Sequence, residues 1–591
     1  MPENLTVVIT AKRNGTADPL EDLVDTRISL SLLETSSAVF RFADPTMSKL
    51  DSNTWNIGDA IEVSAQVGAT VTKVFEGEVV ALGADQRDDS RHEFVVEAMD
   101  HSHRLSGALT PKTYLKQKYS DVATTIANAH GLTAKCTSTS MQHDYLLQTV
   151  SDRAYLTFMA DDIGYEWFVD AKQLVFRPRP GPGTVAATLK WSTNLTRFEA
   201  RASAADVATS ITVRGWNALK TEGISGQTSA ATSDPTMIGS TAPLATTVLG
   251  KAKAFAKPVN LVPVGLQDAE EATIRSKAIA ADVQGSMMRA TGEADATPAL
   301  RPGVWVDVEE CGVSLSGKYY VTDCEHVFGV RQTFRTRFKM SGRHASGIVG
   351  RGEQQPRAFG QVGLVIGIVT NIKDTVGATQ RVRVKFPAMP DLESAWARVV
   401  TLGAGGGRGG FDMRPEVNDE VLVGFEQGDL RRPFVIGGLL GKADKDVLAA
   451  VDGNGKVANR GIRTRTGNTF VMSDGDDAQG KRHITFTTAD AKSSVRLGED
   501  KVTIKSDAAV PIELVSGEAS IKIDNGAITI KAKSVEIKTQ QGIKLDGLTI
   551  DLKATTAIGI DGGAKLDAKG TMVQIAADGM AALKGAIVKL N

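Results

Sequence analysis

Apolar residues recur in pairs along residues 521–590, with the two members of each pair two positions apart. Successive strong pairs begin seven or eight residues apart, and the residue between the two members is usually polar, as at Lys522 and Thr529. This alternation is typical of a β-strand with one apolar and one polar face. The strong pairs are Ile521/Ile523, Ile528/Ile530, Val535/Ile537, Ile543/Leu545, Ile550/Leu552 and Ile558/Ile560, and Val573/Ile575 and Val588/Leu590 keep the same phase.

A repeat this short cannot bury its own apolar face, so its copies must stack. One chain could coil as a β-solenoid with three strands per coil, or three chains could wind together around a shared core. A flexible linker would not keep Ile and Val in phase, and a flat meander would need turn residues at every repeat. The pattern therefore predicts a β-helical needle, on the order of 50 Å long for roughly ten repeats stacked at about 4.8 Å.

Upstream of this repeat, the pattern predicts a mainly β chain with a few helices. Helices are expected over 122–130, with Ser120 as the N-cap and Gly131 after the end, over 151–164, and over 268–288 with acidic residues in the first turn. Residues 222–262 are rich in Gly, Ser, Thr and Ala and are predicted to be a loop. Strands are predicted at 61–67, 71–80, 92–98, 165–169, 173–177, 304–308, 318–323 and 332–340.

Four or five short strands with clear turns lie between residues 363 and 438. Residues 382–386 alternate apolar and basic side chains, whereas 395–400, 421–425 and 434–436 are apolar runs. Strands of this length in about 80 residues indicate a small closed barrel. The preceding stretch, 341–359, has the composition of a linker.

The charge balance and the cysteine content exclude several classes of protein. The 591 residues include 68 Lys and Arg against 69 Asp and Glu, so no net field attracts nucleic acid or an anionic membrane. Three cysteines, Cys136, Cys311 and Cys324, without a CxxC motif, argue against a disulfide framework and a zinc site. We expect plain thiols, and we expect synthesis in the cytoplasm without a signal peptide or a membrane-spanning helix.

Residues 363–438 hold a dense set of motif residues. They are Gly367-Ile368-Val369, Asn371, Asp374, Gly377, Arg381-Val382-Arg383-Val384-Lys385-Phe386-Pro387, Ser394-Ala395-Trp396-Ala397-Arg398-Val399, Gly409-Gly410-Phe411, Pro415-Glu416-Val417, Asp419-Glu420-Val421-Leu422-Val423-Gly424-Phe425, Gly428-Asp429 and Arg431-Arg432-Pro433-Phe434-Val435-Ile436-Gly437. With these residues, the segment resembles the OB-fold of the VgrG and phage baseplate-spike family. The sequence departs from the family at Asn418, where Gly is usual, and at Gln427, which is often His.

The N-terminal region resembles the baseplate hub of the same family. The matching residues are Phe75-Glu76-Gly77-Glu78-Val79, Asp152, Tyr155-Leu156, Ile163-Gly164-Tyr165, Pro302-Gly303, Val306, Gly317-Lys318-Tyr319-Tyr320-Val321 and His326. The resemblance implies a hub with two barrel-like domains and a few helices (1–350), a linker (351–362), an OB-fold barrel (363–441), a neck of β-hairpins (442–510) and a tail that forms the β-helical needle (511–591).

The family works as a homotrimer, which implies three intertwined chains in the needle. We expect a central spike of a contractile injection system that joins the inner tube to the baseplate and punctures the target envelope on sheath contraction. Its expected partners are itself, tube and hub adaptor proteins, other baseplate proteins and the target envelope, without nucleic acid. An extracellular phage-like particle is favoured. The alternatives are a type VI secretion VgrG, a phage tail spike and, in another class, a cell-wall hydrolase carried on a spike.

The residues that would form the trimer core of the needle follow from the repeat. They are Ile528, Ile530, Val535, Ile537, Ile543, Leu545, Ile550, Leu552, Ile558, Ile560, Val573 and Ile575. No histidine follows His483, so we expect no metal at the needle tip. The needle is instead expected to dock a separate PAAR-type tip protein through Val588, Leu590 and Asn591.

Candidate chemistry is weak, so we expect no enzyme activity, no cofactor and no metal. Residues 442–510 are too few for a lysozyme domain and lack a suitable carboxylate pair. Asp474, Asp476 and Asp477 are interpreted as a solvated hairpin loop rather than a calcium site, and residues 405–410 as a barrel loop rather than a phosphate cradle. His101-Ser102-His103 is interpreted as a polar loop. Arg431 and Arg432 are either interdomain or interchain contacts or solvated surface charges.

Overall fold

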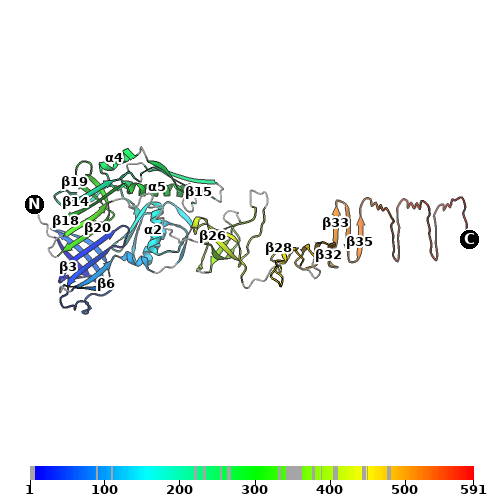
Figure 1. The fold of residues 1–591 in the computed structure, drawn as a ribbon, viewed down its shortest axis with the longest axis horizontal. Helices are drawn as coiled ribbons and strands as arrows, with labels where there is room; N and C mark the ends of the chain where they lie inside the picture. Colours follow the sequence, from blue (N-terminus) through cyan, green and yellow to red (C-terminus); the bar gives the residue numbers. More distant parts are fainter. Residues whose placement is uncertain are drawn as a thin grey trace. The chain divides into compact units, whose positions relative to one another are not determined.

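The computed structural model describes residues 7–590 apart from short internal gaps. The gaps are 88–90, 108–110, 206, 218–221, 231–233, 253–255, 262–265, 267, 330–333, 341–362, 376–379, 388, 404–409, 442–447, 449 and 476–480. The predicted linker 351–362, Asp476, Asp477, most of the glycine run 405–410 and Asn591 therefore lie outside the described residues. The chain divides into two compact units, Met1–Ala443 and Asp444–Asn591. In both, the regular structure of the described residues is mostly strand rather than helix (Figure 1), which confirms the mainly β fold class.

The hub is built on one 13-stranded sheet, in the order β14-β18-β21-β20-β3-β4-β7-β6-β5-β1-β2, with β19 also paired with β20 and β13 paired with β19. Its two halves cover separate apolar cores and meet where β3 pairs with β20. The first half comprises β1 (Val7–Arg13), β2 (Thr16–Asp18), β3 (Leu23–Ser31), β4 (Ser37–Ala43), β5 (Ala60–Val67), β6 (Thr70–Gln86) and β7 (His92–Met99). The second comprises β13 (Val185–Lys190), β14 (Leu195–Ala202), β18 (Met288–Asp295), β19 (Trp305–Glu309), β20 (Gly317–Gly329) and β21 (Phe334–Met340).

Strand alternation explains which face of the hub sheet is buried. Along β4, buried and half-buried residues alternate strictly, and along β21 buried residues alternate with exposed ones. The apolar members, such as Phe40, Phe42 and Phe338, enter the cores, because successive side chains of a strand point to opposite faces.

Along the chain, helices and short strands separate the two halves of the hub sheet. The helix predicted at 151–164 is confirmed as α2 (Asp152–Ile163), with Ser151 Oγ accepting from the Ala154 amide and Gly164 ending it at φ 75°. The predicted N-cap Ser120 is wrong, since α1 (Tyr119–Ala129) begins after Lys118, whose amide donates to Asp121 Oδ2 at 3.1 Å. Around them lie η1 (His101–Ser106), β8 (Lys112–Lys118), β9 (Thr133–Cys136), β10 (Gln142–Gln148), β11 (Tyr165–Asp170) and β12 (Gln173–Pro178).

The loop predicted over 222–262 is wrong. This region contains β16 (Glu222–Ser229), α3 (Pro235–Ile238), α4 (Pro243–Ala252) and β17 (Lys257–Leu261), and β15 (Ala208–Asn217) pairs with β16 and β17. The helix α5 (Ala269–Gly285) packs on β15 and β16 (Figure 1). A Cβ at Gly226 would lie 2.3 Å from the carbonyl carbon of Ala272, so the small residues serve the close approach of a helix rather than a loop.

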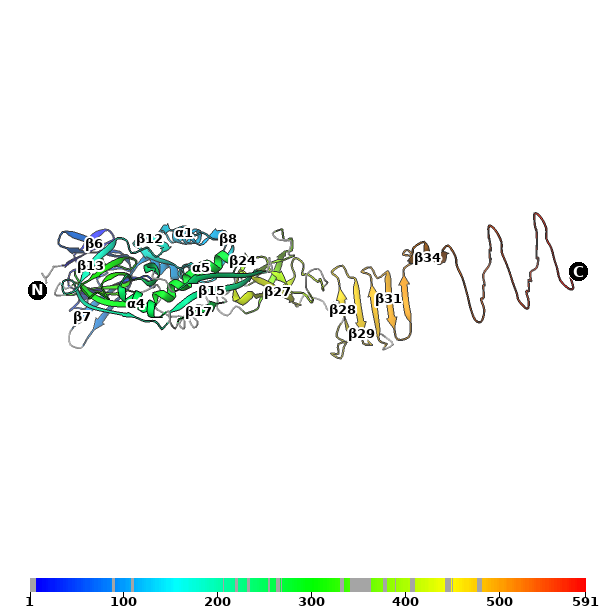
Figure 2. The same ribbon diagram turned by 90° about the horizontal axis from the view of Figure 1, so that it is seen from above.

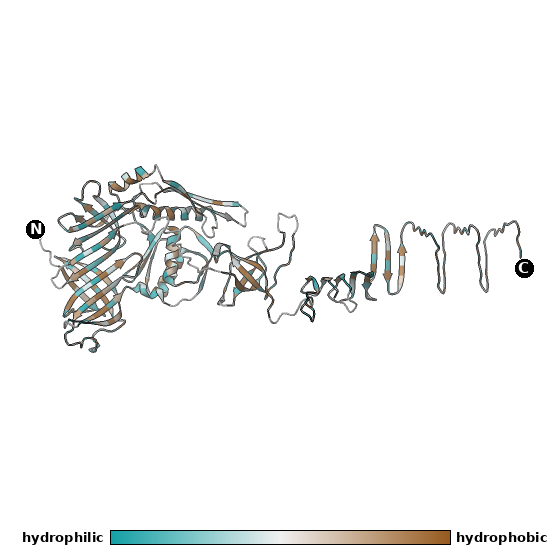
Figure 3. Cartoon of the chain, viewed as in Figure 1, coloured by the Kyte–Doolittle hydropathy of each residue, from teal (hydrophilic) through white to brown (hydrophobic). Residues whose placement is uncertain are grey.

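The barrel confirms the predicted small β domain. Its six-stranded sheet has the order β24-β23-β22-β26-β27-β25 and a core of valines around Phe386. At the place that Figure 1 labels β26, Figure 3 shows strands coloured brown, which marks hydrophobic residues. Asn418 adopts φ 75°, the left-handed conformation that explains why Gly is usual there. The strands are β22 (Val365–Asn371), β23 (Arg383–Phe386), β24 (Met389–Glu393), β25 (Arg398–Val399), β26 (Glu420–Phe425) and β27 (Pro433–Gly438).

The second unit begins with two antiparallel sheets (Figure 2). The neck holds β28 (Asn459–Arg463), β29 (Thr469–Ser473), β30 (His483–Thr487), β31 (Ser493–Gly498) and β32 (Val502–Ser506). The tail begins with β33 (Ile512–Ser516), β34 (Ala519–Asp524) and β35 (Ala527–Lys531), and residues 532–590 form no helix or strand within the chain. Among the described residues, no helix is both long and apolar enough to cross a bilayer.

The first repeats of the tail form an antiparallel meander, so the prediction that excluded a meander is wrong for them. Ile521 pairs with Ile530 and Ile523 with Ile528 in an antiparallel hairpin. The connection is Asn525-Gly526, and both residues have positive φ, 44° and 83°. An Asn-Gly dipeptide is the strongest short hairpin signal, because it supplies two positive φ angles at little cost.

Candidate functional site: the hub–barrel junction and the apolar tail

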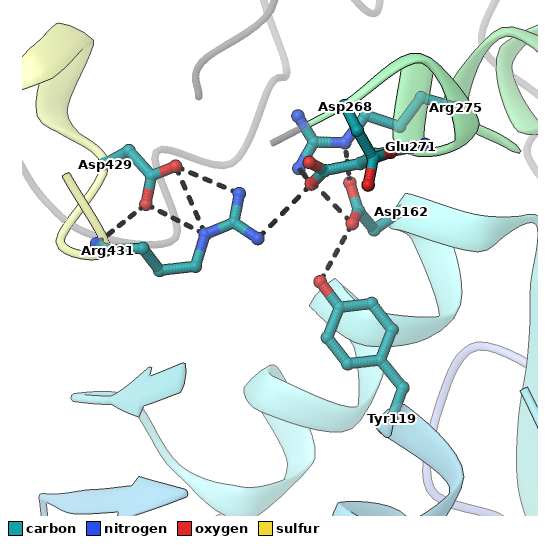
Figure 4. Close-up of polar contacts among 7 residues, drawn as sticks. All are labelled: Tyr119, Asp162, Asp268, Glu271, Arg275, Asp429 and Arg431. Carbon is teal, nitrogen blue, oxygen red and sulfur yellow. Dashed lines mark hydrogen bonds and ion pairs between the residues drawn. The ribbon is translucent and has the colours of Figure 1, made fainter. Parts of the chain in front are cut away.

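A buried arginine of the barrel contacts the hub. Arg431 lies between β26 and β27, and its Nη1 donates to Glu271 Oε1 on α5 at 3.3 Å. Its Nε and Nη2 donate to Asp429 at 3.1 and 3.0 Å (Figure 4). The side chains of Arg431, Asp429 and Glu271 are 10%, 7% and 2% exposed. One guanidinium therefore joins a barrel carboxylate to a hub carboxylate away from solvent.

The network continues through three helices of the hub. Arg275 Nη2 lies 3.0 Å from Glu271 Oε1, and its Nε lies 2.6 Å from Asp162 Oδ1 on α2. Tyr119 on α1 donates its hydroxyl to Asp162 Oδ2 at 2.9 Å (Figure 4). The N-terminus of α5 is held as well, since Asp268 Oδ1 accepts from the Glu271 amide at 2.9 Å.

Charge pairing fixes the protonation states of this network. Burial alone would raise the pKa of Asp429, but the charge and hydrogen bonds of Arg431 hold that pKa below its ordinary value. Burial would lower the pKa of Arg431, yet Asp429 and Glu271 raise it well above its usual range. Burial and the nearby Asp162 raise the pKa of Tyr119 well above normal, so its phenol stays neutral and donates.

Apolar packing closes the junction beside the ion pairs. Tyr145 and Leu147 of β10 pack against Leu392 and Leu430 of the barrel. The Tyr145 hydroxyl donates to the backbone carbonyl of Glu393 at 2.8 Å, and burial raises the pKa of Tyr145. The two domains thus share an apolar cluster and a charge network, which together resist their separation.

Sequence reasoning found only part of the junction. Arg431 and Arg432 were each expected to be either an interdomain or interchain contact or a solvated surface charge. The interdomain contact is confirmed for Arg431. Arg432 instead pairs with Glu426 inside the barrel at 3.3 Å. Glu271, Arg275 and Asp162 were missed. Glu271 and Arg275 stand four apart on a helix, but this spacing alone does not distinguish a buried pair from an ordinary surface pair.

The predicted needle-core residues form an uncovered apolar series in a single chain. Their side chains range from 52% exposed at Ile558 to 75% at Ile575. Ile528 and Ile530 lie in β35, and the later ones, from Val535 onward, belong to no strand of the described chain. The predicted tip residues Val588 and Leu590 are 51% and 82% exposed.

The remaining candidates have structural explanations. The polar loop expected at His101-Ser102-His103 is instead the 3-10 helix η1, which Asp100 caps and in which His103 Nε2 lies 3.1 Å from Glu78. Asp474 forms an ion pair with Arg460. All three cysteines are free, and burial raises the pKa of each thiol. In the described part of the chain, no group of three or more His, Cys, Asp or Glu could hold a metal ion.

Residues 27–329, more than half of the chain, match the family model of the Alg8 N-terminal domain. The chain belongs to the Alg8 N-terminal domain family. A second model, the type VI secretion system/phage-baseplate injector OB domain, matches residues 365–440, the barrel of this Alg8-type chain. No curated protein matches the chain.

Two solved structures from Francisella share the fold of this Alg8-type chain at low identity. The lidded Francisella PdpA–VgrG complex has a TM-score of 0.53 at 7% identity, covering 85% of this chain and 81% of that one. The half-lidded form has a TM-score of 0.51 at 9% identity, covering 85% and 88%. An E. coli component of the type VI secretion system, similar to T4 bacteriophage tail proteins, has a TM-score of 0.45 at 12% identity, covering 73% and 99%.

The resemblance to the VgrG and phage baseplate hub-and-spike family is thereby confirmed.

Proposed function

We propose that this chain is the central spike of a contractile injection system, in which three copies join the inner tube to the baseplate and puncture a target envelope on sheath contraction. The proposal rests on the exposed apolar residues of the tail. Its apolar side chains recur in strand phase over residues 521–590 and stay more than half exposed from Ile528 to Ile575. Such a series is unfavourable in water unless it is covered, and further copies of the chain, which carry the same repeat, can cover it.

The hub–barrel junction supports a mechanical role. The barrel precedes the neck and tail along the chain, so a force on the tail reaches the hub through the barrel. Arg431, Glu271 and the apolar cluster around Tyr145 hold the barrel to the hub. Separating the two domains would expose buried charges and apolar surface together, and both changes are unfavourable in free energy.

Oligomeric state tests this proposal directly. Native mass spectrometry of the purified full chain should show trimers at micromolar concentration. A folded chain that stays monomeric throughout would contradict the shared needle and leave the single-chain solenoid. Fractionation of cells and culture medium tests the setting. We favour an extracellular phage-like particle over a type VI apparatus or a phage tail. The chain would be made in the cytoplasm, assemble into the baseplate and appear in released sheathed particles.

Partners follow from the same proposal. Inner-tube and baseplate proteins should co-purify with the hub, and a PAAR-type tip protein should bind the tail. Val588 and Leu590 are exposed and apolar, as a docking surface requires. Replacing both by Asp should release the tip protein while the trimer persists. Tip binding that is unchanged in this variant would place the docking surface elsewhere.

The competing class is a hydrolase carried on a spike. We propose that the chain acts without catalysis, so purified trimers should not clear peptidoglycan in a muralytic assay. Clearing that survives further purification would favour the hydrolase.

A further inference from the structure

Three asparagines of the chain, Asn14, Asn454 and Asn525, are followed directly by glycine. Two of these dipeptides form the same kind of turn. Asn14-Gly15 connects β1 to β2, Asn525-Gly526 connects β34 to β35, and all four residues have positive φ. Positive φ at both central residues is what a two-residue type I′ hairpin loop requires. The two turns therefore differ in their surroundings rather than in their local sequence.

The hub holds the side chain of Asn14 at both of its polar atoms. Nδ2 donates to Asp59 Oδ1 at 2.8 Å, and Oδ1 accepts from the Ala60 amide at 2.9 Å. The Asn14 amide donates to the Ala60 carbonyl at 2.8 Å. The strand before this turn, β1, pairs with β5 along its whole length and has buried residues in the hub core. The turn at Asn14 is therefore fixed by the hub.

The loop around Asn454 is held by Asp452. The Gly455 amide donates to the Asp452 carbonyl at 3.0 Å. Asp452 Oδ1 accepts from the amides of Asn454 and Lys456 at 2.9 and 2.8 Å. The Gly455 nitrogen is thus engaged within a closed loop.

Asn525 has neither restraint. Among the described residues, its side chain and the Gly526 amide have no hydrogen-bond partner. A Cβ added at Gly526 would meet nothing within 4 Å, so the space beside this glycine is open. Neither β34 nor β35 contains a buried residue, and β35 is the edge strand of its three-stranded sheet. Local opening of so exposed an edge costs little free energy.

We infer that Asn525 is a site of spontaneous deamidation in the folded chain, whereas Asn14 and Asn454 are protected. The inference does not rest on the proposed function. The Gly526 amide nitrogen, after giving its proton to a base in the solvent, attacks Cγ of Asn525. An N–Cγ bond forms, the Cγ–Nδ2 bond breaks, and ammonia leaves with a proton from water. The product of this step is a five-membered succinimide ring.

Water then opens the ring in one of two ways. Cleavage of the new N–Cγ bond leaves aspartate at position 525. Cleavage of the original peptide C–N bond leaves isoaspartate, in which the main chain runs through Cβ and Cγ. Each product has exchanged the amide NH₂ for a hydroxyl, so the step needs only water and releases only ammonia.

The geometry of ring closure explains why the three sites differ. The glycine nitrogen and the asparagine Cγ must meet in an aligned arrangement, which requires a free side chain and a turn that can open. Glycine favours the attack at all three sites, because no Cβ crowds its nitrogen. Asn14 has the right sequence and the same turn, but its amide group is bound to Asp59 and Ala60. Only Asn525 meets both requirements.

The modification would alter the start of the tail repeat. Asp524 already pairs with Lys522 at 2.8 Å, and the product places a second carboxylate next to it. Isoaspartate also adds one carbon to the main chain of a two-residue loop, and loop length sets the register of a hairpin. We therefore expect isoaspartate to weaken the pairing of Ile523 with Ile528.

Peptide mapping of the full chain tests this inference. The purified folded chain is kept at mildly alkaline pH for weeks, and samples are digested with a lysine-specific protease at mildly acidic pH. Mass spectrometry follows amide loss in residues 13–49, 446–456 and 523–531, each of which contains a single asparagine. Asn525 should convert at least tenfold faster than the other two. Conversion of Asn525 that is as slow as that of Asn14 would overturn the inference.

The same chain in denaturant is the matched control. Unfolding removes the hydrogen bonds that hold Asn14 and the loop around Asn454, and it leaves only the shared Asn-Gly sequence. The three sites should then convert at similar rates. A preference for Asn525 that persists unchanged in denaturant would show that neighbouring sequence, and not the restraints at the other two sites, causes the difference, and it would overturn the structural argument.

Asn525→Gly gives a second readout. Glycine keeps the positive φ of the turn without a steric cost, so the hairpin is retained while the reactive amide is removed. An isoaspartate-specific methyltransferase should label residues 523–531 of the aged wild-type chain, and this label should fall at least tenfold in the variant. Label that persists at the wild-type level in this peptide would place the modification at another residue.

Discussion

Arg431 of the barrel and Glu271 of the hub lie 3.3 Å apart, Nη1 to Oε1, and both side chains are at most 10% exposed. The contact joins residues 160 positions apart in the sequence. A buried pair of this kind contributes modestly while both partners are present, but it becomes costly when one partner is removed. The junction is therefore the place where single substitutions should report on the coupling of hub and barrel.

Arg431→Ala should destabilise the full chain by about 3–5 kcal/mol, because Asp429 and Glu271 would remain buried without their cation. Denaturant unfolding monitored by tryptophan fluorescence measures this loss. Arg432→Ala is the matched control, since its partner Glu426 is 41% exposed, and it should cost about 1 kcal/mol or less. Equal losses in the two variants would show that the buried network does not hold the junction.

Tyr145→Phe and Tyr145→Ala should separate the hydrogen bond from the packing. The first removes the donation to the Glu393 carbonyl and should cost about 1 kcal/mol. The second also removes the aromatic ring from the apolar cluster and should cost about 3–5 kcal/mol. Limited proteolysis should then cut Tyr145→Ala between hub and barrel faster than wild type. An unchanged rate would mean that the ion pairs alone maintain the junction.

Acid should weaken the junction through His143. This histidine is 1% exposed and stacks on Tyr119 with ring centroids 4.3 Å apart. Burial lowers its pKa to about 4, and the charges that face it are Arg431, Asp162, Arg275 and Asp429. The unfolded chain, with a histidine pKa near 6.5, binds the proton first, so stability falls as the pH drops from about 6.5 to about 4.

The expected loss from His143 is about 3 kcal/mol across that window. Chemical unfolding at a series of pH values measures it. His143→Gln should reduce the slope of stability against pH between 6.5 and 4. A slope that the substitution leaves unchanged would exclude His143 as its source.

Gly226→Ala should destabilise the hub by about 1–3 kcal/mol, because the added Cβ would lie 2.3 Å from backbone atoms of α5. Gly223→Ala, on the same strand, has nothing within 4 Å of the added Cβ and should change stability by about 0.5 kcal/mol or less. Thermal unfolding of the two variants compares them directly. Similar midpoints would contradict the close packing of α5 on β16.

Local patterns were enough to predict several elements. Ser151 and Gly164 bound α2 because a side-chain cap and a left-handed glycine act within one turn of the chain. Alternation along β21 indicated a strand with one buried face. The OB barrel could be predicted from its resemblance, because its glycine and valine positions follow a shared strand pattern.

Other features depended on contacts that no local pattern contains. Residues 222–229 have the composition of a loop, but they form a strand because α5 packs closely on Gly226. Arg431 could be named as a candidate contact, but its burial depends on Glu271, which a distant helix supplies. The Asn525-Gly526 hairpin was locally encoded and was overlooked.

The phase of apolar and polar residues along the tail can be read from the amino-acid order alone, because strand alternation needs only neighbouring positions. The pairing of β3 with β20, which joins the two halves of the hub into one sheet, and the burial of Arg431 between hub and barrel become apparent only in the folded chain. The two kinds of feature differ in the sequence separation of the residues that make them. Strand phase and helix caps are set within a few residues, whereas sheet pairing and charge burial depend on segments that meet only after folding.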